Sequence, residues 1–243
     1  MRPLIIASTY NERDNIESLV REILIQAPQA NVLVVDDNSP DGTGQLVREL
    51  MTKESRLHLL ARPGKLGLGT AILDGMRWGL ERGYDPICTM DADFSHHPKY
   101  LPAILEGSKK YDVMIGSRYI PGGGTRNWGI HRKILSKGSN LVSWILLGFP
   151  VHDCTGCYRA YRADLLRKID RDSIKSSGYS FVEEVLELCY RAGATMGETP
   201  IIFEDRRAGQ SKISKKEIFR AVGTLFRLRW QRIRLGIRPG RRS

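Results

Sequence analysis

The sequence has 243 residues, 41% of them hydrophobic and 27% charged, with a net charge of +11; this fits one large domain with its own core. We expect no secretion signal, because the first two residues lead into an apolar run of only four. The longest uncharged stretch, 138–152, has 15 residues and contains Gly148 and Pro150, whereas a membrane-spanning helix needs roughly 20 apolar residues. These features exclude a transmembrane helix and predict a chain that stays in the cytosol.

Short apolar runs alternate with helical patterns over the first half of the chain, which is typical of a mostly parallel sheet covered by helices. Polar or acidic side chains follow three of the runs, at residues 9–12, 36–37 and 91–93. Because such folds bind ligands at the carboxyl ends of their parallel strands, we expect the site at this edge. The predicted strands cover residues 4–7, 32–36, 57–61, 87–91 and 113–117, and helices are predicted over 16–27 and from residue 43.

The second half of the chain begins with a break at residues 121–124, which contain three glycines and predict a flexible loop. Helices are predicted over 132–147 and 181–192, and an extended segment over 194–203. The last predicted helix, 215–235, is amphipathic, with Val222, Phe226 and Trp230 among the apolar residues on one side.

The excess charge lies entirely at the end of the chain, since residues 205–243 hold 13 Lys and Arg against two Asp and Glu. A basic segment of this kind binds an anionic membrane surface or nucleic acid, and it also occurs as a solvated face without a partner. The amphipathic pattern favours the membrane interface. We therefore predict a catalytic domain over residues 1–214 and a basic, membrane-interfacial segment over residues 215–243.

Two carboxylates at the end of the fourth predicted strand are the best candidates for metal binding. Asp91 and Asp93 share one side if the extended conformation continues past the strand end. Two oxygen ligands suit a hard cation such as Mg²⁺ or Mn²⁺, which takes its remaining ligands from phosphates and water. A solvated Asp-x-Asp turn is the plain alternative, and the Asp36-Asp37 pair is either a ribose contact or a cap.

An ordered set of motifs over residues 4–216 strongly resembles the dolichol-phosphate (polyprenol-phosphate) mannose synthase family. That family has the GT-A fold and belongs to the inverting enzymes of glycosyltransferase family two. The resemblance implies a GT-A type nucleotide-sugar-binding α/β fold with a mostly parallel central sheet flanked by helices, plus a C-terminal amphipathic basic helix. The motifs are Thr9-Tyr10-Asn11-Glu12, Asp36-Asp37-Asn38-Ser39, Gly67-Leu68-Gly69-Thr70, Asp91-Ala92-Asp93-Phe94-Ser95, Gly116-Ser117-Arg118-Tyr119, Arg132-Lys133, Asp153-Cys154-Thr155-Gly156 and Asp205-Arg206-Arg207.

The resemblance also implies roles for single residues on the donor side. Tyr10, Glu12, Val35 and Asp37 would hold the nucleoside. Ser8 stands where the family usually has proline, and its backbone could keep the donor contact. Asp91, Ala92 and Asp93 would meet donor and metal. Ser95 stands where relatives have either a glutamine metal ligand or a serine, so it is a third candidate ligand.

Four basic residues complete the implied site. Arg118 and Arg132 match arginines associated with the transferred sugar and the acceptor phosphate, and together with Asp93 they are the candidate catalytic residues. Arg206 and Lys212 match residues that close over the donor phosphates. For each arginine taken alone, a surface ion pair is the plain alternative.

These roles predict the transfer of mannose from GDP-mannose to dolichol or polyprenol phosphate, with Mg²⁺ or Mn²⁺ as cofactor and a β-linked product. The enzyme would sit peripherally on the cytoplasmic face of a membrane, with anionic lipid and small membrane subunits as candidate partners. Three alternatives remain: a glycosyltransferase using another donor such as UDP-glucose, a nucleic-acid-binding protein acting through its basic tail, and a catalytically silent subunit. The tail has no recognised nucleic-acid module, so we expect no nucleic-acid partner.

Overall fold

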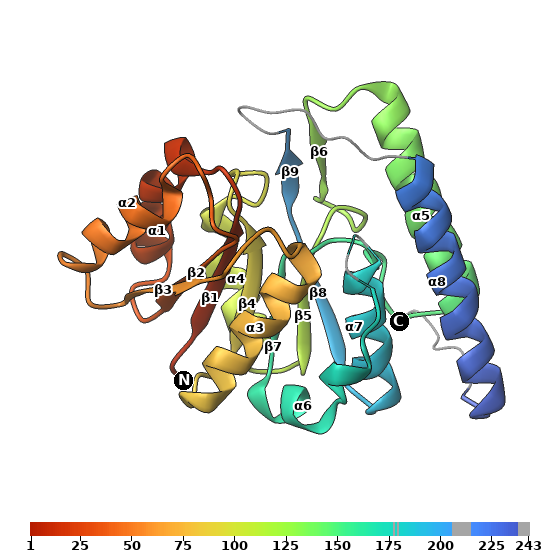
Figure 1. Cartoon of the computed structure of the whole chain (residues 1–243). Coiled ribbons are helices and arrows are strands. Elements are labelled where there is room, and N and C mark those ends of the chain that lie inside the picture. The colour runs from red at the N-terminus through yellow and green to blue at the C-terminus, as the bar shows by residue number, and fades with distance from the viewer. Residues whose placement is uncertain (177, 179, 206–214, 238–243) are drawn as a thin grey trace.

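The computed structural model describes residues 1–176, 178, 180–205 and 215–237. One seven-stranded sheet lies between two layers of helices, and a two-stranded sheet stands above its carboxyl edge (Figure 1). The strand order is β3-β2-β1-β4-β7-β5-β8; β7 is antiparallel to both neighbours and the other pairs are parallel. The strands are β1 (Leu4–Thr9), β2 (Asn31–Asp36), β3 (Leu57–Ala61), β4 (Ile87–Asp91), β5 (Val113–Ser117), β7 (Arg159–Tyr161) and β8 (Met196–Pro200), with β6 (Gly124–Arg126) pairing β9 (Ile202–Glu204) in the small sheet.

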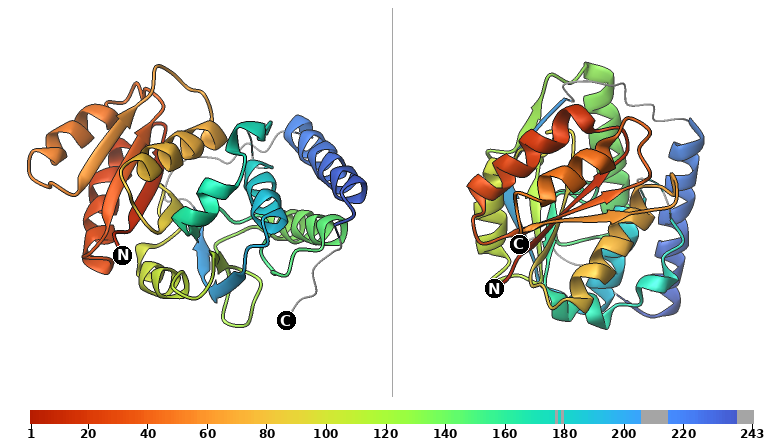
Figure 2. Two further views of the ribbon diagram at one scale, coloured as in Figure 1. Left: turned by 90° about the horizontal axis from the view of Figure 1, so that it is seen from below. Right: turned by 60° about the vertical axis from the view of Figure 1, so that its left-hand side comes forward.

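The core has two parts because side chains alternate between the faces of the sheet. On β1, Leu4 and Ile6 enter one core and Ile5 and Ala7 enter the other. Helices therefore cover both faces (Figure 2). Helices α3 (Leu68–Glu81), α6 (Ala163–Lys168) and α7 (Phe181–Arg191) pack on the first core, and α1 (Arg13–Gln26), α2 (Thr43–Met51) and α4 (Leu101–Gly107) pack on the second.

The predicted fold class is confirmed, and three of the predicted strands agree with the structure to the residue: 57–61, 87–91 and 113–117. Strands β6 and β7 were not predicted. Each has only three residues, and β7 begins with the fully buried Arg159, a residue type that rarely lies inside a sheet.

Helices α5 (Ile130–Leu147) and α8 (Lys215–Arg234) lie side by side at one end of the sheet (Figures 1 and 2). Leu225 and Leu228 of α8 are buried in the first core. In the part of the chain that the structure describes, no helix is long and apolar enough to cross a membrane.

A buried arginine fixes α8 to the body of the protein. Arg232 has no exposed surface, and its Nε lies 2.8 Å from both carboxylate oxygens of Glu187 on α7. Its Nη1 donates to the carbonyl of Leu147 at the end of α5, and the guanidinium stacks on the Tyr190 ring at 4.2 Å. Removing one partner of such a pair leaves a buried charge uncompensated, so α8 is bound firmly to α5 and α7.

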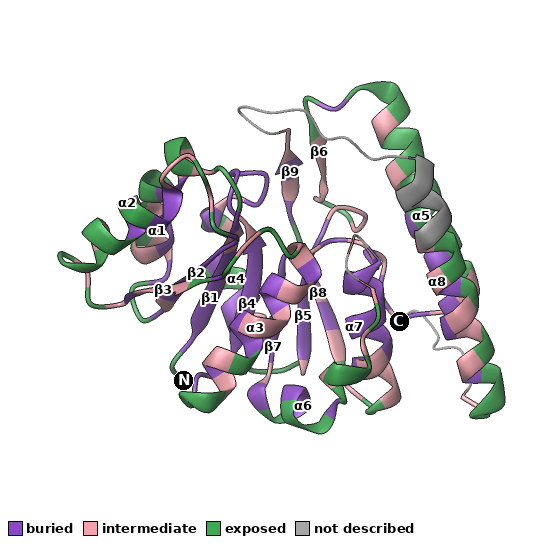
Figure 3. Cartoon of the chain, in the orientation of Figure 1, coloured by how far each residue is buried: buried purple, intermediate pink, exposed green. Residues whose placement is uncertain are grey.

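The outward sides of α5 and α8 are unusually apolar. Figure 3 shows α5 exposed along much of its length. We call this surface the outer apolar face. Its most exposed large residues are Ile130 (74%), Ile134 (65%), Leu141 (52%) and Ile145 (63%) on α5, with Phe226 (60%), Trp230 (58%) and Ile233 (55%) on α8.

Candidate active site

The backbone is unusual where three parallel strands end. Asn11, Asn38 and Phe94 follow β1, β2 and β4, and their φ angles of 62°, 56° and 61° are left-handed. Asparagine adopts this conformation readily, but a bulky side chain does so only where its surroundings hold it. The turn after β4, next to Asp91 and Asp93, is therefore a fixed part of this edge.

Ser8 lies at the centre of the edge. The sheet register places Ser8 beside Val35 on one side and beside Asp91 on the other, so three predicted donor residues are neighbours. The Ser8 hydroxyl is buried without a hydrogen-bond partner among the described residues, whereas the Val35 side chain lies in the core. A donor at this edge would meet an unsatisfied hydroxyl at Ser8 and only the backbone of Val35.

Asp37, a predicted nucleoside contact, organises the loop that contains Leu66 and Gly67. One carboxylate oxygen lies 2.5 Å from Nη1 of the buried Arg62, and the other accepts from the amides of Leu66 and Gly67 at 3.0 Å. A carboxylate offers about four acceptor positions, and three of them are used here. The contact of Asp37 with a nucleoside would use the remaining one.

Tyr10 and Glu12 lie on the loop after β1. Tyr10 is exposed, and the Lys65 ammonium stands 3.9 Å from the centre of its ring. Glu12 accepts from the Asn15 side chain at 2.8 Å, and its amide donates to the Thr43 hydroxyl at 3.1 Å. The aromatic ring of Tyr10 is thus at the surface of this edge, where a base could stack on it.

Asp91 ends β4, and the chain bends over residues 92–96 instead of staying extended. The extended conformation on which a shared side for Asp91 and Asp93 depends therefore does not continue past the strand end; the left-handed Phe94 is part of the bend. The Asp91 amide donates to Nδ1 of His96 at 3.0 Å, so this nitrogen is unprotonated. Burial lowers the pKa of His96 well below its ordinary value, and the 3.4 Å contact between Nδ1 and the Asp91 carboxylate is not an ion pair.

Asp93 and Ser95 lie deeper than Asp91. Both are buried, and the Asp93 carboxylate accepts from the Ser95 amide at 3.0 Å. The Ser95 hydroxyl is buried without a hydrogen-bond partner among the described residues. Two carboxylates and a hydroxyl are hard oxygen donors of the kind that Mg²⁺ and Mn²⁺ prefer. Within the described ranges no three His, Cys, Asp or Glu side chains gather as a metal site, so a cation here would need oxygens from a ligand and water.

Arg118 is held by a buried carboxylate. Its Nε and Nη2 lie 2.7 and 2.8 Å from the two oxygens of Asp153, and Nη2 also donates to Thr155 at 2.7 Å. Burial alone would raise the pKa of Asp153, but the charge and hydrogen bonds of Arg118 outweigh it and lower the pKa to about 2. The guanidinium therefore stays charged and closely fixed.

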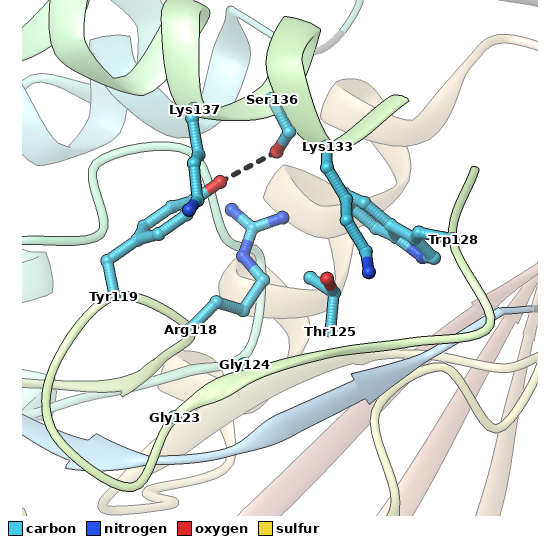
Figure 4. A pocket seen from close by; sticks show the side chains of 9 residues that line it. All are labelled: Arg118, Tyr119, Gly123, Gly124, Thr125, Trp128, Lys133, Ser136 and Lys137. Atoms are coloured by element: carbon cyan, nitrogen blue, oxygen red, sulfur yellow. Dashed lines mark hydrogen bonds between the residues drawn. The ribbon is translucent and has the colours of Figure 1, made fainter. Parts of the chain in front are cut away.

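A pocket of about 230 Å³ lies between Arg118 and helix α5. Figure 4 shows Lys133 and Lys137 extending from α5 into it, opposite Arg118. Neither lysine has a carboxylate partner among the described residues, and every charged side chain that lines the pocket is a cation. Its lining is Arg118, Tyr119, Gly123, Gly124, Thr125, Trp128, Lys133, Ser136 and Lys137.

Arg132 lies beside this pocket but does not line it. Its Nη1 is 2.5 Å from the Asp205 carboxylate, and its guanidinium lies 4.2 Å from the centre of the Trp128 ring. The indole nitrogen of Trp128 is buried without a hydrogen-bond partner among the described residues. Arg206 and Lys212 fall outside the described residues.

The motif-based assignment gave no role to Asp153, Trp128, Lys133 or Lys137. The two lysines carried a usable signal, because residues four apart lie on one side of a helix and both fall in the predicted helix next to Arg132. The Arg118–Asp153 pair joins residues 35 positions apart, and such a distance leaves no local pattern.

Comparisons with known proteins identify the family. Residues 4–170 match glycosyl transferase family 2. The chain is 44% identical to an undecaprenyl-phosphate mannosyltransferase of Micrococcus luteus, over 98% of this chain and 100% of the relative. It is 45% identical to a polyprenol monophosphomannose synthase of Mycolicibacterium smegmatis, over 91% of this chain and 84% of the relative.

Solved structures share the fold at low identity. Glucosyl-3-phosphoglycerate synthase from Mycobacterium tuberculosis, in complex with Mn²⁺, UDP and its product, aligns with a TM-score of 0.62 at 17% identity over 97% of this chain and 80% of that chain. A mannosyltransferase from Pyrobaculum calidifontis, in complex with GDP-Man and Mn²⁺, aligns with a TM-score of 0.56 at 16% identity. The alignment covers 99% of this chain and 65% of that chain. The resemblance found in the motifs is confirmed: the chain belongs to glycosyl transferase family 2 and, within it, to the polyprenol-phosphate mannose synthases.

Proposed function

We propose that the chain transfers mannose from GDP-mannose to the phosphate of a polyprenol such as dolichol, giving a β-linked lipid-phosphate mannose and GDP. One observation carries the proposal: a cationic pocket and an exposed apolar surface lie on the same helix. Lys133 and Lys137 of α5 point into the pocket, and Ile134, Leu141 and Ile145 of α5 face outward. A lipid phosphate has the same two parts, an anionic head and an apolar chain.

The names of the two relatives support the acceptor and the sugar, because each name refers to a polyprenyl phosphate and to mannose. The GDP-Man and Mn²⁺ complex of the Pyrobaculum mannosyltransferase supports the donor and the cofactor through the fold alone. Ser8, Tyr10, Glu12 and Asp37 would border the nucleoside. Arg206 and Lys212 remain proposed partners of the donor phosphates.

Asp91 and Asp93 would hold a divalent cation, Mg²⁺ or Mn²⁺, with Ser95 as a third oxygen donor. When bound, such a cation stabilises the negative charge that develops on the leaving diphosphate. The chain itself would contribute the fixed turn after β4, which keeps Asp93 at one position through the Ser95 amide.

The chemistry would be a single displacement. A lipid phosphate oxygen attacks the anomeric carbon as the nucleoside diphosphate leaves from the opposite side, so an α-linked donor gives a β-linked product. The attacking phosphate is already anionic near neutral pH, and no general base is needed. The main task of the protein is to offset the repulsion between two anions, which Arg118, Lys133 and Lys137 would do at the acceptor.

Transfer is tested by incubating the protein with GDP-mannose, polyprenyl phosphate and either Mg²⁺ or Mn²⁺, and by identifying the lipid product with mass spectrometry and its anomeric linkage with NMR. We expect a β-mannosyl phospholipid and GDP. UDP-glucose in parallel tests the alternative donor; transfer of glucose in preference to mannose would contradict the proposal.

The outer apolar face would bring the enzyme to the cytoplasmic surface of a membrane. Apolar patches rimmed by basic residues mark such contacts. Replacing both Phe226 and Trp230 by serine should weaken binding to vesicles of phosphatidylcholine and phosphatidylglycerol by at least about 100-fold, because each aromatic side chain contributes about 1.5 kcal/mol or more when buried. The control is Ile25→Ser, which changes an exposed apolar residue of α1. Equal binding of all three proteins in a sedimentation assay would rule the face out.

A further inference from the structure

Asp153 lies in the loop that follows α5, and side chains from distant parts of the chain hold this loop in place. From β8, one oxygen of Glu198 accepts from the His152 amide at 2.8 Å and contacts the His152 ring at 2.8 Å. The other oxygen accepts from the Asp153 amide at 2.9 Å. Both oxygens of the Glu198 carboxylate, whose side chain is 10% exposed, thus bind two consecutive residues of this loop.

Helix α5 holds the same loop through Asn140. The Asn140 carbonyl oxygen accepts from the Cys154 amide at 2.8 Å, and its amide nitrogen donates to the His152 carbonyl at 2.5 Å. Asn140 is itself buried. Buried backbone groups need hydrogen-bond partners. The Asn140 side chain supplies them to the Cys154 amide and the His152 carbonyl, in place of a neighbouring strand.

The fully buried Arg159 provides a third attachment. It donates to the Cys154 carbonyl at 2.7 Å and to the Val182 carbonyl of α7 at 3.0 Å. We refer to Asn140, Arg159 and Glu198 as the loop clamp. Together they satisfy the amides of residues 152, 153 and 154 and two of the carbonyls, so the loop has little freedom to move.

The loop clamp matters because Asp153 sets the position of Arg118. Asp153 is fully buried, and it accepts from the Arg118 amide at 3.0 Å as well as from the guanidinium. Asn140 lies on the same helix as Lys133 and Lys137. The clamp thus joins the helix that carries two cations of the pocket to the loop that holds the third.

We propose that Asn140 and Glu198 are positioning residues, which fix Arg118 relative to Lys133 and Lys137 so that the three cations present one preformed site for a phosphate monoester. The inference rests on the proposed function for its substrate, a lipid phosphate. Neither residue lines the pocket, and both act through Asp153 and its loop.

The test uses Glu198→Gln and Asn140→Ala in the full chain. The first change keeps the size of the side chain but turns an amide NH₂ toward backbone donors, so at least one of the clamp hydrogen bonds is lost. Steady-state kinetics should show a KM for polyprenyl phosphate raised about 10-fold, with the KM for GDP-mannose changed less than about twofold, since preorganisation is lost only at the acceptor.

A matched control is Asp112→Asn. Asp112 also accepts from a backbone amide, that of Thr195 at 2.9 Å. It precedes β5, whereas Arg118 follows β5, so the two residues lie at opposite ends of the β5–β8 pair. Asp112→Asn should leave both KM values unchanged. A milder variant, Asn140→Ser, covers the case in which Asn140→Ala does not fold, as judged by its thermal melting curve.

Binding of farnesyl phosphate, measured by calorimetry, separates this inference from the proposed function. Absence of mannose transfer by the wild type refutes the proposed function, while the titration still decides on the clamp. Weaker farnesyl phosphate binding in Glu198→Gln and in the Asn140 variants, but not in Asp112→Asn, supports the clamp. Equal affinity in all proteins, or an equal loss in Asp112→Asn, overturns it.

Discussion

The two halves of the site balance their charges in different ways. At the proposed donor edge, the ends of β2 and β4 bring Asp36, Asp37, Asp91 and Asp93 together with one buried arginine, Arg62. On the proposed acceptor side, four arginines pair with carboxylates: Arg118 with Asp153, Arg132 with Asp205, Arg227 with Glu184 and Arg232 with Glu187, which also pairs with Arg191.

This difference determines what each half can bind. The donor edge has an excess of negative charge, which suits a divalent cation. On the proposed acceptor side these four arginines are compensated, and at the pocket Lys133 and Lys137 supply positive charge for an anion. Arginines that look like phosphate ligands in the sequence are thus partly structural, and two lysines take a share of the proposed acceptor role.

The largest effect should come from the acids of the donor half. Asp93→Asn keeps an acceptor for the Ser95 amide but removes a charge, so the fold should persist while kcat/KM falls on the order of 10³-fold, as expected for loss of charge stabilisation in the transition state. Radiolabelled mannose transfer at saturating Mn²⁺ measures this. Asp41→Asn, at a carboxylate that binds Thr43 on the neighbouring turn, is the control, and equal activities would remove Asp93 from the site.

Glu183 is an exception on the acceptor side, because it contacts Ser143 of α5 and has no ion pair among the described residues. Burial raises its pKa to about 7. A raised folded-state pKa stabilises the fold below the unfolded value near 4.5, and this contribution is lost as the pH rises through 7.

The Glu183→Gln variant tests this exception. At about 1.4 kcal/mol per pKa unit, its free energy of unfolding relative to the wild type should rise by about 3 kcal/mol between pH 4.5 and 8.5, as measured by urea titration. The exposed Asp164→Asn should show no such trend. A difference between Glu183→Gln and wild type that is independent of pH would show that the pKa of Glu183 is the same in the folded and unfolded states.

The smallest effect should come from the lysines taken singly. Lys133→Ala and Lys137→Ala should each raise the KM for lipid phosphate about 10-fold, because a hydrogen bond to a charged group contributes about 1.5–3 kcal/mol. The KM for GDP-mannose should stay the same. Lys109→Ala, which removes a lysine paired with Glu106 by α4, is the control. Unchanged acceptor kinetics in both pocket variants would assign the acceptor phosphate to the arginines after all.

The sequence predicts the parallel part of the sheet well because such strands are buried on both faces and appear as continuous apolar runs. The edge that carries the donor residues follows directly, since strand ends meet there. The sequence leaves the conformation after β4 open, because a left-handed Phe94 has no signal of its own.

The acceptor side could not be predicted to the same depth, since its geometry depends on contacts between distant residues. The amphipathic pattern of the last helix placed Phe226 and Trp230 on one side correctly. It could not show that this side faces outward, or that Arg232 supplies the opposite, buried side. A charge count treats Arg232 as surface charge, whereas in the structure Arg232 is buried and pairs with Glu187.

Arg232 also has a consequence for how the protein is made. Glu187 leaves the ribosome 45 residues before Arg232, so Glu187 pairs with Arg191 of its own helix and lacks its buried partner until α8 arrives. Domains generally fold as units during synthesis, and here the unit is complete only when that helix has docked. Chains that lack α8 would therefore leave Glu187 and the Leu147 carbonyl at the end of α5 without Arg232 at the same time.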